Sequence, residues 1–189
     1  MNGKTLALAA CCGLLAACAM MTGTDGPENA FRISAGGMSD NAKMTPKMAG
    51  NFKKNPNCTG ENFTPALQWS NAPAKTRSYA LIVDDQAGRN GLGVSHGVVY
   101  GIPASITSLS EGELGAAPKR FVGGTNTLGS HYVGPCPPRG LSPHHYVFTL
   151  IATDLEPGAL RAGLKRDELL QSLSGHALAA ASLALRFNQ

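Results

Sequence analysis

The chain has 189 residues, enough for one domain with a hydrophobic core and too few for two ordinary domains. Glycine and proline are abundant, at 23 and 12 residues, and only 15% of residues are charged, which favours a turn-rich sheet protein over a helical bundle or a disordered chain. The formal net charge of +4 is mild and no basic run alternates with aromatic residues, so we do not expect a nucleic-acid partner.

Residues 1–17 have the pattern of a signal peptide, with Lys4 ahead of an apolar run that is too short to span a bilayer permanently. Residues 15–18 read Leu-Ala-Ala-Cys and resemble the bacterial lipobox. We therefore expect Cys18 to be lipidated and residues 18–29 to tether the domain to the periplasmic side of a membrane. The alternative is an ordinary secretory signal without a lipid.

Residues 30–189 contain no internal repeat and are expected to form one domain. Apolar runs bounded by turn residues predict strands, three of them strong and three weaker. The strong runs cover residues 79–83, 94–102 and 145–152, and the weaker ones cover 31–33, 66–69 and 183–187. Because no helix of ten or more residues separates the runs, we expect a mostly β fold in which antiparallel sheets pack as a sandwich.

One helix is predicted near the C-terminus, as a small flank to the sheets. Asp167 and Glu168 place carboxylates in its first turn, where they favour a helix. Apolar side chains then recur at a spacing of four and form one stripe. The stripe consists of Leu169, Leu173, Ala177 and Ala181, beside Leu170 and Leu178. Gly175 is a candidate break between two helical pieces.

Processing at Cys18 leaves Cys58 and Cys136 in the body of the protein. An oxidising compartment would allow a disulfide between them, but their spacing does not decide between a bridge and two separate buried thiols. Neither cysteine belongs to a Cys-x-x-Cys pair, so a zinc site is not expected.

Residues 93–97 read Gly-Val-Ser-His-Gly, which matches the nucleophile elbow of serine hydrolases, and Asp154 and His176 follow in the hydrolase order. The elbow requires a strand, a sharp turn and then a helix, whereas residues 98–103 have a strand pattern. The chain also lacks the alternating strands and helices of that fold. We therefore expect no enzyme, and a serine esterase that uses Ser95 is the least favoured alternative.

Asp84 and Asp85 end a predicted strand. Neighbours on a strand point to opposite faces, so they cannot form a facing acid dyad and one of the two should face inward. Asp85, His96 and His144 could form a metal triad of two histidines and one carboxylate. Nothing in their spacing shows that they converge, so we expect no metal.

The most specific segment is residues 134–146, which reads Gly-Pro-Cys-Pro-Pro-Arg-Gly-Leu-Ser-Pro-His-His-Tyr. Three prolines ahead of Gly140 stiffen the backbone and remove amide donors, so the remaining polar groups are held in fixed directions. A rigid loop of this kind suits the wall of a ligand pocket.

This segment resembles the signature of the phosphatidylethanolamine-binding, or Raf kinase inhibitor-like, protein family in its bacterial branch. Residues 58–69 are similar to the family's Cys-x-Gly-x-Asn-x-Ser-Pro-x-Leu-x-Trp, with Thr64 in place of serine. Residues 76–85 resemble the strand that leads to its Asp-Pro-Asp-Ala loop, and residues 175–179 resemble the Gly-His-x-Leu-Ala of its C-terminal helix. The four stretches occur in the family's order.

The resemblance implies a β-sandwich with an anion pocket at one end, lined by Asp85, His96, Pro137, Pro138, His144 and Tyr146. The sequence departs from the family in two places. Residues 85–88 read Asp-Gln-Ala-Gly, without the loop's proline and second aspartate, and residues 96–97 read His-Gly in place of His-Trp. We therefore expect a wider or less apolar mouth than in the family.

Two imidazoles and backbone donors would bind a phosphate or carboxylate head, more strongly when His96 or His144 is protonated below roughly pH 6.5. Asp85 would orient a histidine or receive an ammonium or hydroxyl group of the ligand. No activated nucleophile accompanies these residues, so we expect binding of a small anionic ligand, without cofactor and without turnover. The alternative is a protein partner: the domain would act as an inhibitor of an envelope enzyme, such as a kinase or protease.

Overall fold

The computed structural model describes residues 29–189, so the predicted signal peptide and Cys18 lie outside the described residues. The strands are β1 (Arg32–Ala35), β2 (Leu67–Ser70), β3 (Ser78–Asp85), β4 (Val94–Pro103), β5 (Ser108–Leu109), β6 (Val122–Gly123), β7 (His144–Thr153) and β8 (Ala177–Phe187). The helices are α1 (Gly88–Gly91) and α2 (Arg166–Leu173), with short 3-10 turns at Pro46–Met48 and Glu113–Gly115. Within the described part of the chain, no helix has the length and apolar character needed to cross a membrane.

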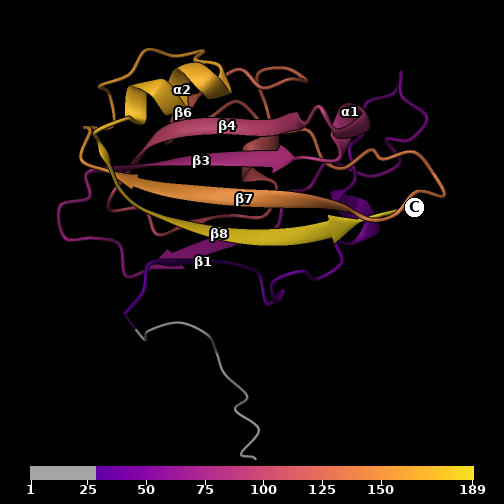
Figure 1. Cartoon of the computed structure of the whole chain (residues 1–189), viewed down its shortest axis with the longest axis horizontal. Helices are drawn as coiled ribbons and strands as arrows, with labels where there is room; N and C mark the ends of the chain where they lie inside the picture. The colour runs from indigo at the N-terminus through magenta and orange to yellow at the C-terminus, as the bar shows by residue number, and fades with distance from the viewer. Residues whose placement is uncertain (1–28) are drawn as a thin grey trace, which may run out of the picture.

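The strands form two antiparallel sheets, which confirms the mostly β sandwich (Figure 1). The small sheet has the order β1-β2-β5, and the large sheet has the order β6-β4-β3-β7-β8. The three strongly predicted strands correspond to β3, β4 and β7, which lie side by side in the large sheet. Residues 41–44 run along the outer edge of β8 and bond to its backbone, so that this edge is not open.

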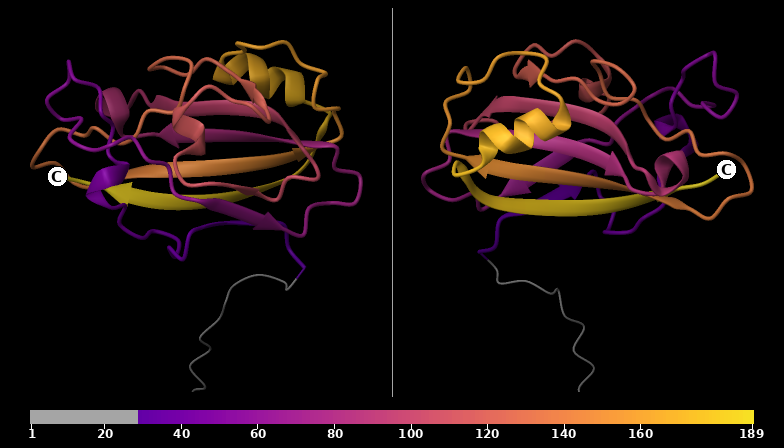
Figure 2. Two further views of the ribbon diagram at one scale, coloured as in Figure 1. Left: turned by 180° about the vertical axis from the view of Figure 1, so that it is seen from behind. Right: turned by 45° about the horizontal axis from the view of Figure 1, so that its top comes forward.

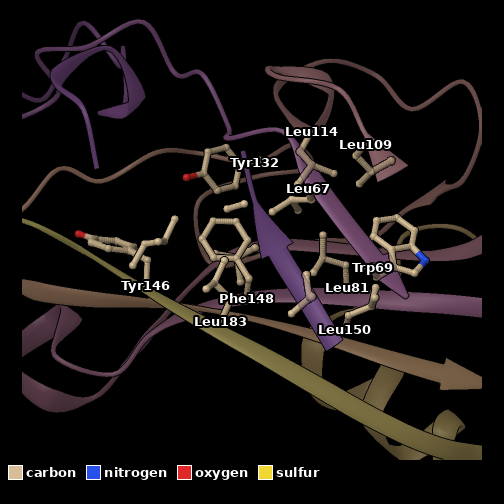
Figure 3. Packing of buried hydrophobic residues seen from close by; sticks show 14 of the residues in the cluster. Leu67, Trp69, Leu81, Leu109, Leu114, Tyr132, Tyr146, Phe148, Leu150 and Leu183 are labelled. Carbon is tan, nitrogen blue, oxygen red and sulfur yellow. The ribbon is translucent and has the colours of Figure 1, made fainter. Parts of the chain in front are cut away.

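Both faces of the large sheet are buried. Alternate residues of β3, such as Tyr79, Leu81 and Val83, contribute to the main core. Figure 3 shows Leu81 among the other side chains of this core. The intervening residues of β3 face outward, where α2 covers the sheet (Figure 2). Leu169 and Leu173 of α2 cluster there with Ala80 and Ile82 of β3. A fully buried leucine contributes about 1.5–3 kcal/mol, so α2 is held mainly by these side chains. Burial on both faces explains why β3 reads as one continuous apolar run.

The predicted C-terminal helix is correct only as far as Leu173. Gly175 adopts a left-handed φ of 82°, which ends the helical region, and the chain from Ala177 onward is strand β8. β8 pairs with β7 along its length, and residues 181, 183, 185 and 187 are buried in alternation. The backbone bonds offered by the β7 edge and this alternate burial outweigh the helix preference of the alanines.

Candidate functional site

The candidate site lies at one end of the large sheet, where β3 ends and where β4 and β7 begin. Asp85, the last residue of β3, is opposite Val94 of β4 on one side and Tyr146 of β7 on the other. This register brings the residues from three separate sequence stretches together. Asp85 and Tyr146 lie on the face of the sheet that packs into the main core, and their predicted place in a pocket lining stays a prediction.

A β-bulge decides which face His96 occupies. Val83 is paired with Gly97, but the next residue, Asp84, is paired with Ser95, so His96 is the extra residue of β4. Bulges of this kind redirect side chains near the end of a sheet. As a result His96 faces inward, whereas Ser95 shares the outer face with Asp84.

The inward-facing His96 ring packs edge-to-face against Tyr146, with ring centroids 5.0 Å apart. Its Nδ1 lies 2.6 Å from the carbonyl oxygen of Val133. A carbonyl only accepts, so Nδ1 carries the proton and Nε2 is an acceptor in the neutral ring.

Burial lowers the pKa of His96 below its ordinary value, against smaller opposing effects of the Val133 hydrogen bond and the nearby aspartates. His96 is therefore neutral at pH 7. The expectation that protonation of His96 strengthens anion binding does not fit this environment, because a buried imidazolium would be poorly solvated.

Asp85 and His144 form a buried pair. His144 Nδ1 lies 2.7 Å from Asp85 Oδ2, and the backbone N–H of Ala87 donates to Oδ1 at 2.9 Å. Only 4% of the Asp85 side chain is exposed, so both carboxylate oxygens are occupied within the protein. Asp85 therefore fixes the orientation of the His144 ring and leaves Nε2 as the ring atom available to a ligand.

Two tyrosine hydroxyls lie at the same end of the core. Burial raises the pKa of Tyr132 and, with the Asp85 charge, that of Tyr146, so both remain neutral donors. The Tyr132 hydroxyl is buried without a hydrogen-bond partner. Figure 3 shows both rings with their oxygens directed away from Leu81 and Leu150. Tyr132 is not among the predicted site residues, because no local pattern in the sequence distinguishes it from a core aromatic residue.

The proline-rich segment is fixed to distant parts of the chain. A disulfide joins Cys136 to Cys58, so the pairing that the sequence left open is present in the structure. Pro137 is buried, and its carbonyl accepts a hydrogen bond from Gln189 Nε2 at 2.8 Å. Pro138 is exposed. The two prolines expected to form a wall thus have different environments.

Asn62 connects this segment to the tyrosine end of the core. Its Oδ1 accepts from the Gly134 backbone N–H at 2.7 Å, and its Nδ2 donates to the Tyr132 carbonyl at 3.0 Å. A Cβ at Gly134 would overlap the Met48 carbonyl oxygen, so only glycine fits at this point. The rigidity predicted for residues 134–146 therefore arises from tertiary contacts as well as from proline.

The groups of the hydrolase motif do not assemble. His176 Nδ1 lies 2.8 Å from Asp154 Oδ1, just beyond the C-terminal end of β7. Ser95 lies at the other end of the sheet, about 20 Å away at 3.3 Å per residue along the strands. Among residues 29–189, no group of three or more His, Cys, Asp or Glu side chains is arranged to hold a metal ion.

Residues 38–188 match the family model described as phosphatidylethanolamine-binding protein. A UPF0098 protein of Methanothermobacter thermautotrophicus is 38% identical over 133 residues, which cover 67% of this chain and 83% of that protein. "Putative lipoprotein LppC" of Mycobacterium tuberculosis is 38% identical over 125 residues, 64% of this chain and 59% of its own length.

Two solved structures have the same fold. The crystal structure of Escherichia coli YbcL, described as a member of the mammalian PEBP family, superposes with a TM-score of 0.75 at 27% identity and covers 84% of this chain and 98% of its own. A homolog from Chlamydia trachomatis gives 0.71 at 28% identity, with 85% and 99% covered. Together with the matched residues, these likenesses show that the chain belongs to the phosphatidylethanolamine-binding protein family.

Proposed function

We propose that this protein is an exported binding protein that holds the anionic head of a small ligand, of the phosphate or phospholipid head-group type, at the site of Asp85, His96, His144 and Tyr146. The observation that carries the proposal is the buried Asp85–His144 pair. An isolated buried carboxylate is strongly unfavourable, so the fold retains Asp85 together with a histidine that compensates it.

The pair gives His144 two useful states. With Nδ1–H bonded to Asp85, a neutral ring presents Nε2 as an acceptor. When the ring carries both protons, Asp85 balances its charge and Nε2–H donates to an anionic oxygen. In either state Nε2 is the ring atom that meets the ligand.

The other groups suit a head that combines an anion with a donor. The Tyr146 hydroxyl donates to an anionic oxygen, and the neutral His96 ring offers Nε2 to an ammonium or hydroxyl group. A phosphoethanolamine head carries both kinds of group. The family's name supports this chemical class, and so does the presence of both a donor and an acceptor side chain at the site.

We propose binding without turnover. The inner site has no nucleophile with an adjacent base and an oxyanion site, and Ser95 lies on the opposite face of the sheet from His96. A fluorophosphonate probe tests this point, since labelling of Ser95 would revive the esterase alternative.

Calorimetric titration with glycerophosphoethanolamine tests the site. His144→Ala should weaken binding at least tenfold at pH 6, because it removes the donor to the phosphate. His145→Ala is the matched control: its side chain is exposed on the same strand and points to the other face. An unchanged affinity in His144→Ala would refute the assignment.

We also propose that Cys18 carries a lipid that anchors the domain in the cell envelope. The lipobox pattern at residues 15–18 and the name of the Mycobacterium tuberculosis relative support this. Cys18→Ser should move the protein from the membrane fraction to the soluble envelope fraction. Retention in the membrane fraction would contradict the anchor.

A further inference from the structure

A cavity lies on the outer face of the large sheet, behind the inner site. It has a volume of about 440 Å³ and is formed by the ends of β3 and β4, the loop between them, the loop after β6 and the start of α2. The residues that matter for its chemistry are Asp84, Arg89, Ser95, Thr127, Lys165 and Arg166. None of these belongs to the inner site.

The Ser95 hydroxyl is the most informative group of this cavity. Ser95 is only 7% exposed, and its Oγ has no hydrogen-bond partner in the structure. Its backbone is satisfied by Thr127, whose Oγ1 accepts from the Ser95 N–H at 3.0 Å and whose own N–H donates to the Ser95 carbonyl. The hydroxyl is itself buried, and Ser95 lines the cavity, so a ligand bound there is a candidate for the missing partner.

The bulge in β4 places Ser95 on the face of the sheet that borders the cavity. Ser95 is paired with Asp84 across the sheet, so the two side chains share the outer face. Asp84 reaches the start of α2, where Arg166 Nε donates to its Oδ2 at 2.8 Å. Ser95 therefore lies beside a charged pair that borders the cavity.

The charge balance of the cavity is positive. Arg166 bonds to both Asp84 and Asp167, so these three side chains together carry a charge of −1, and Arg89 and Lys165 bring the lining to +1. Arg89 and Lys165 also line the cavity, and neither has an acidic partner in the part of the chain that the structure describes. The N-terminal end of α2 adds a partial positive charge on the same side.

We propose that this outer cavity is a second ligand site, which binds a hydroxylated small molecule that carries a phosphate or carboxylate. Arg89 and Lys165 hold the anionic group, and Ser95 Oγ bonds to a hydroxyl of the ligand. The volume lies within the ordinary range of ligand pockets and suits a molecule of monosaccharide size. The site is distinct from the inner one, because the two occupy opposite faces of β3 and β4.

Titration of the ¹⁵N-labelled protein by NMR tests this site, with glucose 6-phosphate and glucuronate as probes. Either probe should shift the amide signals of Ser95, Thr127 and Arg166. Tighter binding of glucose 6-phosphate would identify the ligand's anionic group as a phosphate, and tighter binding of glucuronate would identify it as a carboxylate. Glucose should bind at least tenfold more weakly, because it lacks the anion. Inorganic phosphate should bind at least fivefold more weakly than glucose 6-phosphate, because it has no sugar hydroxyl that could bond to Ser95 Oγ.

Three variants locate the binding. Ser95→Ala should weaken the tighter probe about fivefold without lowering the melting temperature, because Oγ makes no hydrogen bond within the protein. Lys165→Ala should weaken it about tenfold. Lys75→Ala removes an exposed lysine from the loop before β3 and should change nothing.

The same titration of His144→Ala separates the two sites. Its affinity for the sugar probes should equal that of the wild type, since His144 faces the inner site. The proposal is overturned if neither probe shifts the outer-face amides, if Ser95→Ala binds as tightly as the wild type, or if inorganic phosphate alone binds as tightly as glucose 6-phosphate.

Discussion

The bridge between Cys58 and Cys136 should be a principal source of stability. It joins the loop after Pro46–Met48 to the proline-rich segment, across a sequence separation of 78 residues. Around it the backbone is closely packed: a Cβ at Gly50 would lie 2.6 Å from Cys136 Sγ. The variant Cys58→Ala/Cys136→Ala removes the cross-link and leaves no free thiol at either position.

The expected loss follows from the length of the closed loop. In the chain-entropy description, a bridge over 78 residues lowers the entropy of the unfolded chain enough to contribute about 4.5 kcal/mol at 25 °C. A domain of this size has a total unfolding free energy of about 5–15 kcal/mol. The double variant should therefore lose about 30% or more of its stability.

Urea unfolding followed by circular dichroism measures this loss. The wild type treated with a reductant is the control, because it loses the bond but keeps both sulfur atoms in place. A loss of about 3–5 kcal/mol in both samples would support the cross-link as the cause. A loss below about 1 kcal/mol in both would exclude the cross-link as a main source of stability and show that other contacts hold the segment.

Two further predictions concern the inner site. Gly134→Ala should lower the unfolding free energy by about 2–4 kcal/mol in the same assay, because the added Cβ overlaps the Met48 carbonyl. Gly158 has open space around it, so the control Gly158→Ala should change the unfolding free energy by less than about 0.5 kcal/mol. Equal effects of the two variants would contradict close packing at Gly134. Because burial lowers the pKa of His96 in the folded state, the unfolded chain binds the proton first and stability should fall as pH drops below about 6.5. His96→Gln should show a shallower fall between pH 7 and pH 5, and identical slopes would exclude this role of His96.

The strands of the large sheet could be predicted because their signals are local. Residues 79–83, 94–102 and 145–152 are apolar, rich in β-branched side chains and bounded by turns, and each lies within an observed strand. The helix prediction beyond Leu173 was wrong because the signal that makes this segment a strand is not local. Alanines at a spacing of four favour a helix in isolation, and only the free edge of β7 makes Ala177–Phe187 a strand.

Some residues of the candidate site could also be predicted from local sequence patterns. The motif in residues 134–146 and the aspartates at the end of β3 identified His144, Tyr146 and Asp85, and strand alternation alone predicted that Asp84 and Asp85 face apart. The structure adds the ring orientation of His144, because the 2.7 Å contact with Asp85 depends on the register between β3 and β7.

Local sequence patterns are enough to predict the sheet-forming segments, the stiff proline-rich loop and the residue types expected at the inner site. The pairing of Cys58 with Cys136, the lowered pKa of His96 and the face on which Ser95 lies follow instead from the tertiary structure. Each of these depends on one shifted pairing or on burial by segments far apart in the chain. The bulge at His96 places the histidine on the inner face of the sheet and the serine on the outer face, and no local pattern in residues 93–97 specifies that shift.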